Sequence, residues 1–249
     1  WFAAEALRNH GDQAESVRQG VEIEVRREPV GVVAIVTPWN FPVATPAWKI
    51  APALAYGNTV VWKPANLTPA SAVALAGIIA RQDLPPGAFN LVMGSGQEVG
   101  DHLAGHPGVD AVTFTGSVEV GRSIATRTLG NRARLQMEMG SKNPMLIMDD
   151  CDLDLAVAHA ANAAFGGTGQ KCTAASRLIV HRSILDQFAD RLVRAAGALQ
   201  VGHALAEGTQ IGPVVSEGQL AENLRWIERG KAGGANLLTG GQQLERPTP

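Results

Sequence analysis

An unbroken run of β-branched and small apolar residues, from Val30 to Val36, does most to limit the possible folds of this chain. A strand that is apolar throughout, without polar alternation, is typical of a parallel sheet covered on both faces. A second such run, Thr59 to Lys63, follows the helix-like segment from Thr45 to Leu54. We therefore expect parallel strands joined by helical crossovers, which is an open α/β sheet.

The same alternation of strands and helices continues along the chain. Further strands are expected at 89–93, 111–114, 145–148 and 177–180, and helices at 68–81, 97–104, 118–128, 153–165, 184–199 and 218–230. A change of pattern after Gly140 predicts two domains, 1–140 and 141–249. Glu22 to Glu28 alternates polar and apolar residues, as one strand of a hairpin does.

Composition limits the class of partner. The chain has 249 residues, 45% of them hydrophobic, and a net charge of −2, with no long basic run. These values argue against a nucleic acid or a membrane as the partner and favour a small molecule. No apolar run approaches the roughly 20 residues of a membrane helix. Two cysteines do not make a disulfide framework, so we expect a reducing, cytoplasmic setting.

Cys172 lies in a polar, glycine-rich segment, Gly169 to Thr173. A nucleophilic cysteine needs access and surroundings that favour the thiolate, whereas a structural cysteine is an inert, buried hydrophobe. Cys151 lies in an acidic stretch instead. The residues alone leave both roles open for Cys172.

Two further residues suit a covalent mechanism at such a thiol. Asn40 follows the first buried strand and could donate its amide to an oxyanion, although asparagine before Phe-Pro also simply makes turns. Glu138 is flanked by Met137, Met139 and Gly140, and an apolar setting would raise its pKa toward that of a general base. The alternative is a solvated glutamate at a helix end or strand edge.

Cofactor-binding candidates follow two strands. Gly116 to Gly121 joins a strand to a helix and could receive a phosphate on its backbone amides, and with Arg122 and Ser123 it also comes within one residue type of a P-loop. Lys63 ends a buried strand, where a lysine either extends to solvent or reaches a ligand. The histidines lack metal-ligand spacing, so no metal site is expected.

Taken together, Thr-Pro-Trp-Asn-Phe-Pro at 37–42, Phe-Thr-Gly-Ser-Val-Glu-Val-Gly at 114–121, Gln-Met-Glu-Met-Gly at 136–140 and the Cys172 segment resemble the aldehyde dehydrogenase superfamily. The resemblance runs in order from about Val25 to at least Pro213. It implies a Rossmann-like cofactor domain followed by a second α/β catalytic domain, both truncated. It also implies that the strand near 20–30 belongs to an oligomerisation hairpin.

The resemblance assigns roles to the candidates. It implies that Cys172 is the nucleophile, that Glu138 is the general base, and that the Asn40 side chain and the Cys172 N–H hold the oxyanion. The residues it places at the cofactor are Trp39, Lys63, Asn66, Gly116, Ser117 and Gly121. Asn66 stands where many NAD-preferring members carry a glutamate, so we expect NADP to be accepted as well as NAD. Ser141 departs from the family, which usually has glycine there.

The implied activity is NAD(P)-dependent oxidation of an aldehyde to a carboxylic acid through a thiohemiacetal and a thioester on Cys172. The motifs look similar to the branch that acts on semialdehydes, such as α-ketoglutaric or succinate semialdehyde. The whole protein would be a homodimer or homotetramer about twice this length. Because the chain begins with Trp1, we expect processing or a piece of a longer protein. The alternative function is a non-catalytic fragment that keeps the site residues.

Overall fold

The computed structural model describes residues 2–9 and 11–244, and the chain divides into two compact units, Trp1–Met139 and Gly140–Pro249. None of the helices in the described ranges is long and apolar enough to cross a membrane.

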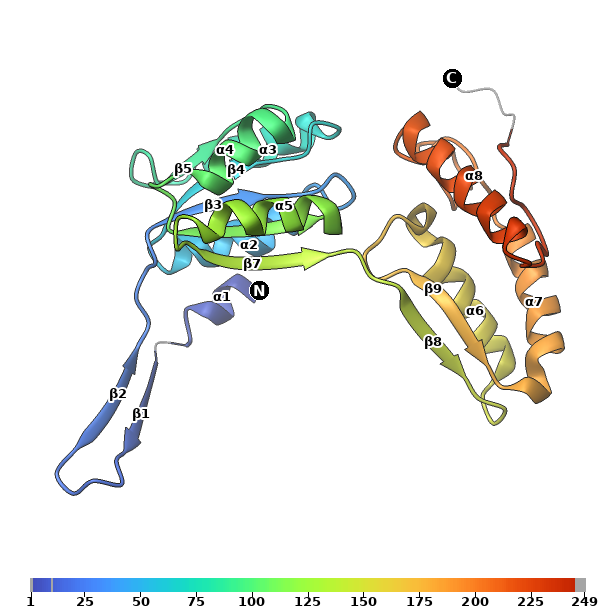
Figure 1. Cartoon of the computed structure of the whole chain (residues 1–249), viewed down its shortest axis with the longest axis horizontal. Coiled ribbons are helices and arrows are strands. Elements are labelled where there is room, and N and C mark those ends of the chain that lie inside the picture. The colour runs from blue at the N-terminus through green and yellow to red at the C-terminus, as the bar shows by residue number, and fades with distance from the viewer. Residues whose placement is uncertain (1, 10, 245–249) are drawn as a thin grey trace. The chain divides into compact units, whose positions relative to one another are not determined.

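The first unit is built on a five-stranded parallel sheet (Figure 1). Its strands are β3 (Val32–Val36), β4 (Thr59–Lys63), β5 (Phe89–Leu91), β6 (Ala111–Gly116) and β7 (Arg134–Met139). They lie in the order β5-β4-β3-β6-β7. The strands β4 and β5 are added on one side of β3, and β6 and β7 are then added on its other side. The direction of strand addition therefore reverses between β3 and β6.

Helices cover both faces of this sheet. They are α2 (Ala44–Ala55), α3 (Pro69–Ile79), α4 (Asp101–Gly105), which a π-helical turn at Gly96–Gly100 precedes, and α5 (Val118–Leu129). On one face Ile35 and Trp62 pack with Ile50 of α2, and on the other Phe114 packs with Ile124 of α5. Two buried faces explain the continuously apolar strands. The predicted open α/β fold is confirmed.

Strand β7 was not expected from the sequence. It pairs with β6 alone among the strands described, so it forms one edge of the sheet. Met137 and Met139 pack on the α5 face. Gln136 and Glu138 therefore face the α2 side, because successive side chains of a strand point to opposite faces. An edge strand that is half polar lacks the apolar run that identified its neighbours.

An antiparallel hairpin precedes the sheet. The short helix α1 (Phe2–Ala6) leads to β1 (Gly11–Glu15), which pairs with β2 (Glu22–Arg26) from Gly11 opposite Arg26 to Glu15 opposite Glu22. The strand expected at 22–28 is β2. Its apolar side chains, Ile23 and Val25, are 44% and 49% exposed, so this hairpin carries an open apolar face.

The second unit contains a two-stranded parallel sheet and several helices. The strands are β8 (Asn143–Ile147) and β9 (Ala175–Val180), and the helices are α6 (Leu153–Phe165), α7 (Leu185–Gly197) and α8 (Glu217–Ala232). Short 3-10 turns lie at Gly166–Gly169 and Arg182–Ile184. The core joins Ile147 of β8 to Val157 of α6 and Phe188 of α7.

Candidate active site

The candidate residues of the first unit gather at one edge of its sheet. Trp39 and Asn40 follow β3, Lys63 ends β4, Gly116 ends β6, and Glu138 is the penultimate residue of β7. Carboxyl ends of parallel strands meet at one edge, and ligands of open α/β sheets bind there, where the strand order reverses. Trp39 and Asn40 on one side and Gly116 on the other flank this reversal between β3 and β6.

Thr37 sets the direction of the chain that leads to Asn40. Its backbone N–H donates to the Lys63 carbonyl at 3.2 Å, which extends the β3–β4 pairing by one residue. Its buried hydroxyl accepts a hydrogen bond from Nε1 of Trp62 at 2.9 Å. Trp39 and Asn40, both half-buried, thus leave the sheet from a fixed point.

Lys63 is folded back instead of extending to solvent. Its side chain is only 5% exposed, and Nζ donates to the Pro64 carbonyl at 3.0 Å. Burial lowers the pKa of Lys63 because it disfavours the charged ammonium. Asn66, three residues on, is exposed.

Two glycines, one at the end of β6 and one in α5, lie where neighbouring side chains leave no room for a Cβ atom. A Cβ atom on Gly116 would lie 2.5 Å from Cζ of Phe114, and one on Gly121 would lie 2.5 Å from Sδ of Met139. Ser117 is the N-cap of α5, since its hydroxyl accepts a hydrogen bond from the Val120 N–H at 3.3 Å. The exposed first turn of α5 therefore starts at the carboxyl end of β6, where a helix N-terminus favours an anion.

Glu138 is not in the apolar setting that its flanking methionines suggested. Its side chain is exposed on the polar face of β7, and its Oε1 accepts a hydrogen bond from Nε2 of Gln136 at 3.1 Å. The expectation was wrong because the neighbours of a residue in a strand point away from it, to the other face.

Lys49 of α2 completes a polar group that the sequence did not reveal. Its Nζ donates to Oγ1 of Thr113 at 2.6 Å and to Oε1 of Gln136 at 2.9 Å, and the Thr113 hydroxyl also contacts Gln136. Burial lowers the pKa of Lys49 from 10.5 to about 8, and the negative charge of Glu138 partly opposes this shift. A lysine between Trp48 and Ile50 gives no local signal of such a contact.

Cys172 is exposed at the centre of a tight turn in the second unit. The Ala174 N–H donates to the Lys171 carbonyl at 3.1 Å, which places Cys172 and Thr173 at the two central positions. Cys151, in contrast, is partly buried against the core around Ile147. The two thiols therefore differ in access.

The segment before this turn is strained and tethered. Gly167, Thr168 and Gly169 have positive φ angles of 64°, 61° and 66°, and Thr168 is a β-branched residue, for which such a φ is a true outlier. The Thr168 hydroxyl donates to the Gly212 carbonyl at 3.1 Å, and Oε1 of Gln170 accepts from the Val215 N–H at 3.0 Å. These contacts brace the segment that leads to Cys172.

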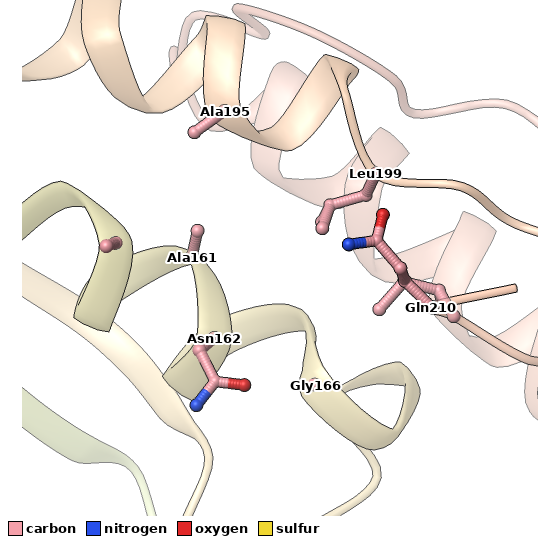
Figure 2. A pocket seen from close by; sticks show the side chains of 8 residues that line it. Ala161, Asn162, Gly166, Ala195, Leu199 and Gln210 are labelled. Atoms are coloured by element: carbon pink, nitrogen blue, oxygen red, sulfur yellow. The ribbon is translucent and has the colours of Figure 1, made fainter. Parts of the chain in front are cut away.

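A mostly apolar cavity of about 310 Å³ also lies in the second unit. Figure 2 shows Leu199 and Gln210 across from Ala161 and Asn162 of α6. Cys172 is not among its lining residues, so the cavity is separate from the thiol. Within 2–9 and 11–244, no group of three or more His, Cys, Asp or Glu residues could hold a metal ion.

Curated proteins of similar sequence are about twice as long as the chain. It is 45% identical over 245 residues to an alpha-ketoglutaric semialdehyde dehydrogenase of Bacillus subtilis, covering 98% of this chain and 50% of that protein. It is 43% identical to a 2,5-dioxopentanoate dehydrogenase of Saccharolobus solfataricus (97% and 51%) and 40% identical to a betaine aldehyde dehydrogenase of Bacillus subtilis (99% and 50%).

Solved structures also match nearly the whole of this chain, which covers about half of each of them. A betaine aldehyde dehydrogenase of Staphylococcus aureus in complex with NAD+ matches with a TM-score of 0.94 and 37% identity, covering 99% of this chain and 49% of that one. A 3,6-anhydro-L-galactose dehydrogenase in complex with NADP matches with a TM-score of 0.92 and 35% identity, covering 99% and 52%. The model of the aldehyde dehydrogenase family matches residues 1–248. With the motifs, the fold and the relatives in agreement, the chain belongs to the aldehyde dehydrogenase family.

Proposed function

We propose that this chain is the cofactor-binding and thiol-bearing part of an enzyme that oxidises an aldehyde to a carboxylic acid with NAD(P)+. Residues 1–140 would be a partial dinucleotide-binding domain and residues 141–249 a partial catalytic domain. The observation that carries the proposal is the exposed Cys172 thiol at the centre of a braced turn, in a chain of this family. A structural cysteine would instead be buried, as Cys151 partly is.

Cys172 would act as the nucleophile. Its thiolate attacks the carbonyl carbon of the aldehyde, a C–S bond forms, and the carbonyl electron pair moves to the oxygen. The Asn40 amide and the Cys172 N–H would donate to that oxyanion, because neutral donors stabilise charge without losing a proton. Collapse of the oxyanion would re-form the carbonyl and expel hydride, for which bound NAD(P)+ would supply the acceptor, and an acyl group would remain on Cys172. Glu138 would then take a proton from a water molecule that attacks the thioester and releases the acid.

The carboxyl edge of the five-stranded sheet fits a dinucleotide. The reversal of strand order between β3 and β6 is the position where such cofactors bind, and the N-terminus of α5 offers backbone N–H groups to a phosphate there. Trp39, Lys63, Asn66, Gly116, Ser117 and Gly121 are the residues we assign to cofactor binding. Asn66 carries no charge that would repel a 2′-phosphate, so we propose that NADP and NAD are both used.

For the substrate we propose the semialdehyde of a dicarboxylic acid. This rests on the relatives at 45% and 43% identity, whose names refer to alpha-ketoglutaric semialdehyde and 2,5-dioxopentanoate. An aminoaldehyde such as betaine aldehyde is the second candidate, from a relative at 40% identity. We also propose a cytoplasmic enzyme that forms a homodimer or homotetramer, with the open apolar face of the β1–β2 hairpin buried against another subunit.

The alternative proposal is a non-catalytic piece, since the chain spans about half the length of the curated relatives it matches. Absorbance of the reduced nicotinamide tests both. The purified chain and its Cys172→Ala variant would be mixed with NAD or NADP and with α-ketoglutaric semialdehyde, succinic semialdehyde or betaine aldehyde. We expect turnover that requires Cys172. Equal turnover in the variant would refute the proposed mechanism, and no turnover by either protein would favour the non-catalytic piece.

A further inference from the structure

Asn143, the first residue of β8, contacts the turn that carries Cys172. Its Nδ2 atom donates to the Cys172 carbonyl at 2.7 Å and to the Ala174 carbonyl at 3.1 Å. One side-chain amide thus uses both of its N–H groups on two carbonyls of the same turn. Both contacts lie within the second unit.

An irregularity in the sheet explains why the side chain makes these contacts. Asn143 lies opposite Ala175, but Pro144 lies opposite Arg177, so the register of β8 and β9 shifts by one residue at this point. Pro144 has no N–H to donate to a neighbouring strand. The Asn143 side chain supplies donors beside this shift, to carbonyls that immediately precede β9.

Asn143 is itself held in place. The Ser176 hydroxyl contacts the Asn143 carbonyl at 3.5 Å, and the Arg177 guanidinium donates to the preceding Lys142 carbonyl at 3.1 Å from Nε and 2.6 Å from Nη2. A side chain with an anchored backbone is a better orienting group than one on a mobile loop.

We infer that Asn143 is a positioning residue for Cys172. This inference rests on the proposed function, in which the Cys172 thiol attacks the substrate and the Cys172 N–H receives the oxyanion. A fixed carbonyl fixes the peptide after Cys172. The Cys172 N–H belongs to the preceding peptide, which the hydrogen bond from the Ala174 N–H to the Lys171 carbonyl holds. The thiol and the N–H then keep a constant orientation, and preorganisation of this kind lowers the barrier of the attack.

Asn143→Asp is the most informative variant because it keeps the shape of the side chain and removes its donors. The carboxylate would face two carbonyl oxygens at neutral pH. Below about pH 4, where an ordinary aspartic acid is protonated, one O–H donor returns. Ser176→Ala is the matched control, since the Ser176 hydroxyl contacts the Asn143 carbonyl only at 3.5 Å, and its loss leaves the Asn143 donors and the Arg177 contacts to the Lys142 carbonyl in place.

Amide hydrogen exchange of the purified chain tests the inference without any need for activity. In Asn143→Asp we expect the protection of residues 171–175 to fall about tenfold at neutral pH, and to recover in acid, while Ser176→Ala leaves it unchanged. Unchanged protection in Asn143→Asp would overturn the inference. An equal loss across β8, β9 and α6 would also overturn it, because Asn143 would then only hold the strand pair.

Turnover supplies the second readout. We expect Asn143→Asp to lower kcat about 10- to 100-fold and to leave the KM for the cofactor within about twofold of wild type. A change in the KM for the cofactor with unchanged kcat would contradict a role at Cys172. Failure of the proposed function is a different result, in which Cys172→Ala and wild type turn over equally while the exchange of residues 171–175 still responds to Asn143.

Discussion

Gln136 joins Glu138 to the cation of Lys49. Its Oε1 accepts a hydrogen bond from Nζ of Lys49 at 2.9 Å, and its Nε2 donates to Oε1 of Glu138 at 3.1 Å. Since the Thr113 hydroxyl also contacts Oε1, donors surround the amide oxygen and the nitrogen must face the carboxylate. The candidate base is therefore oriented by a neutral group, and the lysine reaches it through that group.

Removal of this link should slow the hydrolytic half of the proposed reaction. Gln136→Met keeps a similar length and loses both hydrogen bonds, so Glu138 loses the group that orients its carboxylate. We expect the steady-state rate to fall about tenfold, with a burst of reduced cofactor in the first turnover. The absorbance of the reduced nicotinamide after rapid mixing measures the burst and the steady-state rate. A steady-state rate equal to that of wild type would show that the link has no part in turnover.

Lys49 should make the first unit more stable as the pH rises from about 8 to 10.5. Its pKa is lowered in the folded state, so in this window the unfolded chain binds the extra proton and the free energy of unfolding rises with pH. Lys49→Met should reduce that rise to the part that Lys63 contributes, since burial lowers the pKa of Lys63 in the same unit as well. Urea unfolding followed by tryptophan fluorescence can be confined to the first unit by Trp226→Phe, because the other four tryptophans lie before Met139.

The matched control for that measurement is Lys231→Met, in the last turn of α8 in the second unit. It should leave the pH dependence of the first unit as in the parent chain. If Lys49→Met keeps the same rise between the two pH values, the half-buried lysine is not its source.

Gly121→Ala should destabilise the first unit by about 1–3 kcal/mol, the usual cost of overpacking. The added Cβ would lie 2.5 Å from Sδ of Met139 and 3.2 Å from Cε1 of Phe114, so these side chains or α5 would have to shift. Gly105→Ala is the control, since nothing lies within 4 Å of its Cβ position. Chemical denaturation would measure the stability of the two variants. Equal denaturation midpoints for Gly121→Ala and Gly105→Ala would contradict the close packing at Gly121.

Asn66→Glu should shift cofactor use toward NAD. A carboxylate there would repel the 2′-phosphate of NADP and accept hydrogen bonds from the ribose of NAD. We expect the ratio of kcat/KM for NADP to that for NAD to fall about tenfold or more, which corresponds to roughly 1.4 kcal/mol. Asn66→Gln, which stays neutral, should retain the parent ratio. If the glutamate variant kept the parent ratio, the adenosine ribose would not bind at residue 66.

Local sequence patterns were sufficient to predict the buried strands and several of the helices. The apolar runs identified β3 and β4, and the expected helix at 153–165 coincides with α6. The strands β1 and β7 were missed because each has a single neighbouring strand in the described structure and carries polar side chains that solvent tolerates. A half-polar edge strand has no continuous apolar run to mark it.

The polar partners of the candidate residues could not be read from the sequence. Lys49 and Gln136 are 87 positions apart, and Asn143 and Cys172 are 29 apart, so only the folded chain brings them together. The exposure of Cys172 was foreseeable from its glycine-rich, polar neighbours. The setting of Glu138 was misjudged because sequence neighbours were taken for spatial neighbours, which strand geometry contradicts.

Mass spectrometry of the Glu138→Gln variant tests the central claim most directly. After incubation with NADP and α-ketoglutaric semialdehyde, peptide mapping would locate any covalent acyl group. The proposed mechanism predicts the acyl group on the peptide that contains Cys172, in amounts that depend on the cofactor, and none in the variant that also carries Cys172→Ala. Acylation of Cys151 instead, or the same labelling without Cys172, would contradict it.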